Sequence, residues 1–419
     1  MDYTINKTLN KYILYLFAIP SRVKRQYYLN IVLPKMFQEN KAAWESLSHP
    51  DFIELRRSTL QFIISNQKVD TCLGSYSFKP GGPELLYASC FAALTRHLYG
   101  DLISLSSSQQ GEWIAYLQKY QDEDGLFRDP AIDIPLAEMC DSWGWRHLTL
   151  HVLMALDALG GVAQKPFRIL NHFKKPGQMA EWLETRKWKI DPANVSNEVQ
   201  NYATMLQYAR DFQNESWCRD ALDEMYLWLD RHQDPKTGLW GNGFDTPRLL
   251  SLGVQTGYHL WLLYFYDRRP IQYVERIIDS CLATQNRLGG FGVSLNSSAC
   301  EDIDSIDPLA RFYLRTDYRR DDIHKALEKA LPWVLFNSKP DGGWVFRRGE
   351  ALIFGDNLMS SQPEESSLFP AWFRSLSLAY LGKVLVEKAI AKIEWQFLHA
   401  PGLQFWSDSP SHDDSGSLL

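Results

Sequence analysis

The sequence predicts an all-α fold, an (α/α)6 toroid built from six helix pairs. A glycine followed closely by an aromatic residue recurs along the 419-residue chain. Before most of these glycines, apolar residues have the spacing of an amphipathic helix; after the turn comes a helix that is apolar on nearly every side. Six such pairs are expected to close into a ring, because an open stack would leave an apolar face at each end.

The glycine–aromatic turns set the period of the repeat. They occur at 74–78, 125–127, 238–240, 290–291 and 343–344, and several follow a glutamine and a polar turn. Successive aromatic residues are about fifty residues apart, except for one gap of about twice that length. Trp188 falls in this gap, where a degenerate unit is expected.

The helices of the two layers are assigned from this pattern. Glycine ends the first helix of a pair because it adopts positive φ without steric cost. Outer, amphipathic helices are expected over 112–120, 218–232, 273–284 and 323–336. Inner, mostly apolar helices are expected over 86–98, 143–159, 197–211, 249–266, 305–314 and 366–381.

The toroid is expected to span residues 51–385, with shorter segments on both sides. Residues 1–50 are expected to form a helical segment that packs on the barrel; its apolar run, 12–19, is too short to span a bilayer. Docking of this run on a membrane surface is the alternative. Residues 386–406 are expected to form a C-terminal helix, and 407–419, rich in Ser, Asp and Pro, a disordered tail.

The net charge and the spacing of the cysteines argue against several classes of function. The net charge of -6 and a pI near 6.0 predict no nucleic-acid partner. The six cysteines include no Cys-x-x-Cys pair, so reduced core thiols in a cytoplasmic protein are expected rather than a zinc knuckle or a redox dithiol.

Carboxylates crowd the start of the fifth inner helix. Asp302, Asp304 and Asp307 follow Glu301 directly, and Asp304 and Asp307 lie on one helix face. Carboxyl groups this close do not all ionise equally, so one is expected to keep its proton and act as an acid. Capping of the helix is the structural alternative, although a cap needs only one carboxylate.

Other polar residues are expected at the same level of the ring. They are Glu138, Asp141, Arg146, His147, Gln255, His259, Glu364 and Glu365. His147 and His151, spaced i and i+4, would hold a metal only with a third ligand such as Asp141, and satisfied buried histidines are the simpler interpretation.

These motifs resemble those of the terpenoid cyclase and protein prenyltransferase superfamily. The glycine–aromatic turns are similar to the QW motifs of squalene–hopene cyclases. Class II cyclases follow a Gly-Gly-aromatic turn with an Asp-x-Asp-Asp-Thr-Ala motif, and here Gly289-Gly290-Phe291 precedes Asp-Ile-Asp-Ser-Ile-Asp at 302–307. The resemblance covers roughly residues 50 to 385.

The resemblance implies roles for the acidic residues. Asp302 matches the first aspartate of the motif, and Asp304 matches the middle one, which protonates the substrate's alkene or epoxide. Ser305 stands where the family has a third aspartate, Ile306 where it has threonine, and Asp307 is additional.

The implied activity is that of a class II terpenoid cyclase, which cyclises a linear isoprenoid after protonation. Its cavity would be lined by aromatic rings, whose faces stabilise cations. The candidate substrate-binding residues are Trp143, Trp145, Tyr258, Trp261, Phe312, Trp372, Phe373 and His259. Two alternatives remain: a carbohydrate-active α/α toroid, lyase or hydrolase, whose carboxylates act as acid and base, and a non-catalytic toroid that binds an isoprenoid or a partner protein.

Cofactor and partner expectations follow from the same resemblance. No cofactor is expected, except Mg²⁺ if the substrate is a prenyl diphosphate, held with Arg146, Arg347 or Arg348. The zinc site of prenyltransferases is not expected, since the order here is Cys300-Glu301-Asp302 and residues 366–381 contain no histidine. Typical class II cyclases build the site between two helical domains, so the N-terminal segment, a second copy or a partner chain would have to close the cavity.

Overall fold

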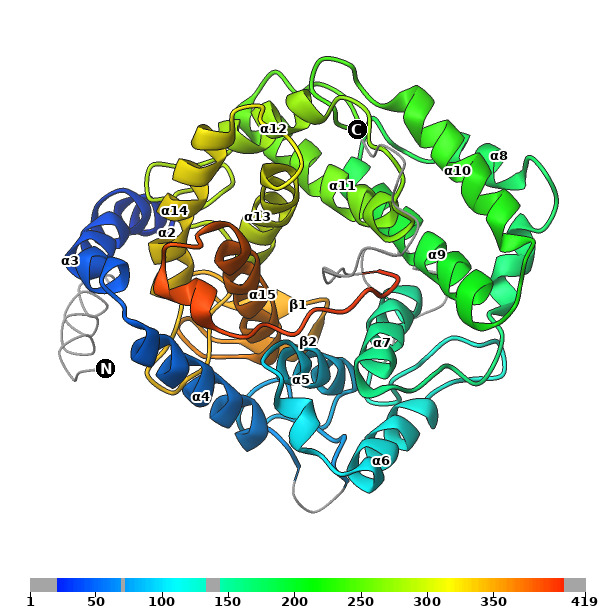
Figure 1. Ribbon diagram of the computed structural model, residues 1–419, viewed down its shortest axis with the longest axis horizontal. Coiled ribbons are helices and arrows are strands. Elements are labelled where there is room, and N and C mark those ends of the chain that lie inside the picture. Colours follow the sequence, from blue (N-terminus) through cyan, green and yellow to red (C-terminus); the bar gives the residue numbers. More distant parts are fainter. Residues whose placement is uncertain (1–20, 69–71, 133–143, 403–419) are drawn as a thin grey trace.

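The computed structural model describes residues 21–68, 72–132 and 144–402, and its helices form a closed (α/α)6 toroid (Figure 1). The predicted fold class is confirmed. The inner ring consists of α5 (Leu86–Leu98), α7 (Trp145–Leu159), α9 (Pro192–Phe212), α11 (Pro247–Tyr266), α13 (Ala299–Tyr313) and α15 (Leu368–Val384). Each inner helix packs on the next, and α15 packs on α5, which closes the ring.

An outer helix precedes each inner one. The outer layer consists of α4 (His49–Ser65), α6 (Ser107–Gln118), α8 (Gln178–Glu184), α10 (Cys218–His232), α12 (Val274–Ala283) and α14 (Arg320–Phe336). The N-terminal elements are α2 (Ser21–Tyr27), the π-helix Tyr28–Val32 and α3 (Leu33–Glu45), which packs on α14. None of the described helices is long and apolar enough to cross a bilayer.

The glycine–aromatic turns join neighbouring pairs. In the fifth pair, Gln285 Nε2 donates to Gly289 O at 2.8 Å and to Ala326 O of α14 at 2.7 Å. A Cβ at Gly289, where φ is +105°, would lie 2.1 Å from Lys329 O. Gln121 and Gln233 make the same paired contacts in their own turns. The repeat therefore exists because each turn must lie against the backbone of the next pair.

The last turn closes the ring against the first outer helix. A Cβ at Gly342, with φ +84°, would lie 2.2 Å from Ser58 O of α4. Trp344 Nε1, two residues on, donates to Thr59 Oγ1 at 3.1 Å. The first and last units of the repeat thus meet as the internal units do, with a glycine turn against the backbone of an outer helix.

The gap in the repeat corresponds to the third pair. Its outer helix, α8, has seven residues, and Trp188 follows it without a glycine turn. The Trp188 ring stacks on Trp228 of α10, with centroids 5.2 Å apart. Trp188 therefore anchors this degenerate unit to the next outer helix.

Several element boundaries differ from the prediction. The fifth inner helix begins at Ala299 rather than at 305, because Ser298 and Glu301 form a capping box at its N-terminus. A C-terminal helix was expected over 386–406; in its described part, 386–402, the structure has only the 3₁₀ turn Ala389–Lys392 followed by irregular chain. The expected tail, 407–419, lies outside the described residues.

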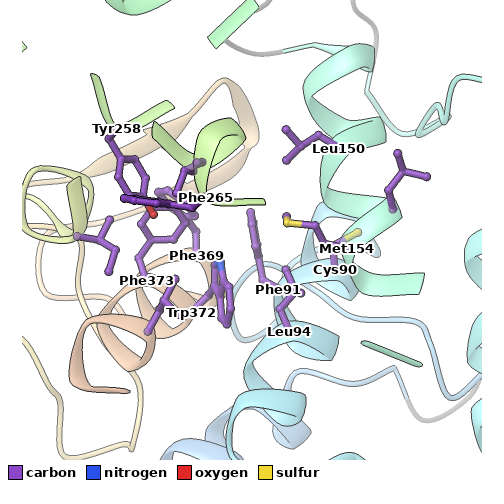
Figure 2. Close-up of a cluster of buried hydrophobic side chains, with 14 of the residues drawn as sticks. Cys90, Phe91, Leu94, Leu150, Met154, Tyr258, Phe265, Phe369, Trp372 and Phe373 are labelled. Carbon is purple, nitrogen blue, oxygen red and sulfur yellow. The ribbon is translucent and has the colours of Figure 1, made fainter. Parts of the chain in front are cut away.

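A β-hairpin, β1 (Leu352–Phe354) and β2 (Asp356–Ser361), lies between α14 and α15. Inside the ring, apolar side chains of the inner helices meet (Figure 2). The figure shows Phe91 and Leu94 of α5, Leu150 and Met154 of α7, and Phe369, Trp372 and Phe373 of α15 around the ring interior. Leu150, Phe369 and Phe373 of this cluster also line a pocket inside the ring.

Candidate functional site

A pocket of about 240 Å³ lies inside the inner ring, toward the N-terminal ends of most of its helices. Side chains of α7, α9, α11, α13, α15 and β1 line it. They are His147, Leu150, His151, Ala193, Asn197, Gln200, Gln255, Tyr258, His259, Cys300, Asp304, Phe354, Phe369 and Phe373. Polar groups and aromatic rings from five inner helices therefore meet in one place.

Asp304 is the one carboxyl group among the described residues that line this pocket. Its side chain makes no hydrogen bond or ion pair with another described residue, and the residue is 4% exposed. Burial raises the pKa of Asp304 well above its usual range, and the nearby charges of Glu301, Asp302 and Asp307 raise it further. Burial and the neighbouring carboxylates therefore favour the protonated form of the Asp304 side chain.

The two flanking aspartates are engaged elsewhere. Asp302 pairs with Arg374 of α15 and accepts hydrogen bonds from Phe291 N at 2.8 Å and from Trp333 Nε1 at 3.0 Å. Asp307 pairs with Arg311, one turn along α13. Both aspartates are completely buried and neither lines the pocket. They hold helices and a turn together around Asp304.

Three histidines line the pocket in the uncharged state. Burial lowers the pKa of His151 and of His259 to about 4. The pKa of His147 lies well below its usual range because of burial and the adjacent His151 and His259. At neutral pH these imidazoles are hydrogen-bonding bases rather than cations.

The hydrogen bonds of His151 and His259 determine which nitrogen carries the lone pair. His151 Nδ1 lies 2.9 Å from the carbonyl oxygen of His147 and must donate to it. His259 Nδ1 lies 3.0 Å from Ser196 Oγ, whose own proton goes to Ala193 O at 2.9 Å. Each ring therefore has a proton on Nδ1, and Nε2 is the basic nitrogen.

Amides and aromatic rings complete the lining. Asn197 and Gln200 of α9 make no side-chain hydrogen bonds to other described residues. Gln255 donates through Nε2 to Ser251, which leaves its carbonyl oxygen as an acceptor. Phe354 of β1 packs on Phe369, with ring centroids 4.2 Å apart. The pocket thus offers hydrogen-bond donors and acceptors beside apolar ring faces, and no Lys or Arg is among its described lining residues.

The predicted site residues divide into two groups. Asp304, Tyr258, His259 and Phe373 line the pocket together. Trp145, Trp261 and Trp372 are buried in the core, and Phe312 lines a separate cavity of about 580 Å³ formed with the segment that follows α11. Trp143, with Glu138 and Asp141, lies outside the described residues.

Other lining residues had weaker sequence signals or none. Asn197 and Gln200 are polar residues on a buried helix. This pattern can be seen in the sequence and would have identified both as candidate lining residues. Phe354 lies in a hairpin without helical periodicity, and nothing in its sequence context indicates that it reaches the ring interior.

No group of three His, Cys, Asp or Glu in the described part of the chain is arranged to hold a metal ion. The basic residues considered for a diphosphate do not line the pocket. Arg347 pairs with Glu301 at 2.8 Å, Arg348 with Glu364 at 2.8 Å, and Arg146 contacts Tyr202. Glu364 also pairs with Lys339, so it too has a structural partner.

Comparison with known proteins shows similarity at the level of fold. No protein-family model matches the chain, and no curated protein matches its sequence. A solved polysaccharide lyase is similar at 12% identity, over 81% of this chain and 98% of that one, with a TM-score of 0.47. The GH76 α-mannanase of Bacteroides thetaiotaomicron is similar at 12% identity, over 81% and 97%, with a TM-score of 0.43.

The interpretation as a class II terpenoid cyclase of isoprenoid biosynthesis is wrong. The solved structures reported above are a polysaccharide lyase and an α-mannanase, not terpenoid cyclases. The pocket supplies the physical reason, because imidazole nitrogens and amide oxygens would capture a carbocation that a cyclase must protect. The apparent DxDD and QW motifs reflect packing: Asp302 anchors the Phe291 turn as Thr149 Oγ1 anchors the Phe127 turn.

Proposed function

We propose that this protein is a carbohydrate-active enzyme that cleaves a glycan by acid–base catalysis in the central pocket. One observation carries the proposal: a buried carboxyl group with a raised pKa and no partner among the described residues, Asp304, shares a pocket with uncharged imidazoles whose Nε2 atoms are basic. A carboxyl group with a raised pKa beside histidines with lowered pKa values is typical of catalytic sites.

The pocket also has the chemistry of a sugar-binding site. A sugar ring presents hydroxyl groups around its edge and C–H groups on its faces. Asn197, Gln200 and Gln255 can hydrogen-bond the hydroxyl groups, while Phe369 and Phe373 offer apolar faces. Such a lining binds a polar ring without requiring a charged partner.

Elimination at a uronate residue fits these groups better than hydrolysis. Glycoside hydrolases generally use a pair of carboxyl groups, whereas the described lining holds one. In an elimination, His259 Nε2 takes the C5 proton of the uronate and Asp304 gives its proton to the leaving O4. The C4–O4 bond breaks, and the electrons of the C5–H bond form a C4=C5 double bond.

The charge of such a substrate would favour both proton positions. A uronate carboxylate in the pocket, bonded to the reacting C5, would raise the pKa of Asp304 and favour its protonated form. The same charge raises the pKa of His259 from about 4, which makes Nε2 a stronger base in the complex than in the free enzyme. Substrate binding would therefore prepare both groups for the reaction.

The test is incubation of the purified protein with uronate-containing and neutral polysaccharides and with short oligosaccharides from each. Elimination produces an unsaturated uronate, detected by its ultraviolet absorbance, whereas hydrolysis produces new reducing ends without that absorbance. We expect absorbance to grow with uronate substrates, and Asp304→Asn to lower kcat by about 10²- to 10⁴-fold.

The matched control is Asp157→Asn. Asp157 is a partly buried carboxyl group near the C-terminal end of α7; desolvation raises its pKa to about 6, and it does not line the pocket. Its substitution is expected to leave kcat within about twofold of wild type. Absence of cleavage across the whole panel, or full activity of Asp304→Asn, would contradict the proposed function.

A further inference from the structure

The two ends of the inner ring are closed differently. The pocket lies toward the N-terminal ends of the inner helices, whereas residues 395–402, the C-terminal segment, run across the ring interior (Figure 1, red). Its contacts with α5, α11 and α15 lie toward the C-terminal ends of those helices. The path of this segment therefore bears on whether the ring is open at that end.

The segment is first anchored on α5 and α15. Gln396 N donates to Leu98 O, the last residue of α5, at 2.9 Å. The Trp395 ring lies 5.1 Å from that of Tyr99, which caps the same helix. Phe397 then lies 5.7 Å from Tyr380 of α15. Backbone and ring contacts thus hold one side of the segment.

The segment continues to the opposite side of the ring. His399 stacks on Tyr266 at the end of α11, with centroids 4.6 Å apart and planes 13° apart. Ala400 is completely buried. A methyl group at Gly402 would lie 3.2 Å from Thr204 of α9 and 3.3 Å from Leu150 of α7.

Leu150 connects the segment to the pocket. Its side chain lines the pocket, and its Cγ is also a neighbour of Gly402. Figure 2 shows Leu150 and Met154 along α7, and Met154 Sδ would lie 3.4 Å from the same added methyl group. The C-terminal segment therefore packs against a side chain of the pocket lining.

We infer that the C-terminal segment makes the pocket a dead end, so that the enzyme acts on the end of a glycan chain. The inference rests on the proposed function of the same pocket. A continuous polymer cannot pass through a ring that is closed on one side. A volume of about 240 Å³ is below the roughly 300–1,000 Å³ of pockets for drug-sized ligands, and it suits about one sugar unit.

The decisive measurement is the size distribution of products over time on a polymer that the wild-type protein cleaves. Chain-end action releases one small product from the earliest time points, while the mean length of the polymer falls slowly. A ladder of intermediate sizes with a rapid fall in viscosity would overturn the inference and leave the proposed function standing. Lack of cleavage of every substrate, short oligosaccharides included, would remove both.

A second measurement tests the segment itself. The Trp395→Ala/Phe397→Ala variant removes two ring anchors, and the milder His399→Leu removes the stack on Tyr266. We expect larger fragments to appear among the products of both variants, because the chain no longer stops at a fixed depth. Val386→Ala, at a site 74% exposed, is the matched control and should keep a single product size.

Folding of each variant is checked by circular dichroism and by its thermal midpoint. A folded double variant that still releases one product size would show that the segment does not close the ring. If the double variant does not fold, His399→Leu and the wild-type product pattern decide the question.

Discussion

Arg374 of α15 forms an ion pair with Asp302 of α13 in the interior of the ring, where neither side chain is exposed to solvent. The guanidinium also donates to Phe346 O at 2.9 Å. Asp302 in turn receives the backbone N–H of Phe291 and the indole N–H of Trp333. One buried pair therefore connects two inner helices, an outer helix and a repeat turn.

The first prediction concerns the stability of this pair. Asp302→Asn or Arg374→Met alone leaves one buried charge without its partner and should lower the free energy of unfolding by about 3–5 kcal/mol. The double variant removes both charges and should recover part of that loss. Urea unfolding of the three variants measures the coupling between the two residues. If the double variant loses as much free energy of unfolding as the two single variants together, the prediction is contradicted.

The second prediction is the pH dependence of activity. The reaction requires Asp304 protonated and His259 uncharged. Because the pKa of His259 is about 4 in the free enzyme, kcat/KM should fall as the pH drops below about 4. It should also fall on the alkaline side, where Asp304 loses its proton, well above the usual pKa of an aspartate. A kcat/KM that rises steadily into the alkaline range would contradict the role of Asp304 as the acid.

The third prediction separates stability from catalysis at Asp304. Its pKa is higher in the folded than in the unfolded state, so its favourable contribution is complete below the unfolded pKa and is lost as pH rises through the folded pKa. Asparagine resembles the protonated acid and does not ionise. Asp304→Asn should therefore match wild-type stability in acid and exceed it at neutral and alkaline pH, in urea unfolding at several pH values. Equal pH dependence in both proteins would mean that Asp304 does not keep its proton in the fold.

His151 and His259 change the pH dependence of stability in the direction opposite to that of Asp304. Their folded pKa values lie below that of the unfolded chain, so the stability they contribute is present above about pH 6.5 and is lost as pH falls toward 4. His259→Gln should weaken this acid-side loss, since glutamine does not titrate. The same unfolding series measures it, and an unchanged acid limb would contradict the buried neutral state of His259.

Much of the fold was predictable because the periodicity of a buried helix is a local signal. The predicted bounds of α5 and α10 agree with the structure to the residue. Asp304 and His259 could be singled out because polar residues are rare on helices buried on all sides. Asp302 was misinterpreted because its partner Arg374 is 72 residues away, and no local pattern connects the two.

The path of the C-terminal segment was not predictable for a related reason. A C-terminal helix was expected over 386–406, but aromatic contacts with α5, α11 and α15 hold the described residues 395–399 instead. Such contacts depend on the closed ring. Only the assembled toroid brings Tyr99, Tyr266 and Tyr380 within reach of one short segment.

The last prediction tests how the ring is closed. Gly342→Ala places a Cβ 2.2 Å from Ser58 O of the first outer helix, at a φ of +84°. Gly81→Ala has a similar φ, +74°, but meets nothing within 4 Å, so it isolates the backbone cost of about 1–2 kcal/mol. Gly342→Ala should cost about 1–3 kcal/mol more, because α4 and the last turn must separate. Equal losses in urea unfolding would mean that the contact between the last turn and α4 does not hold the ring shut.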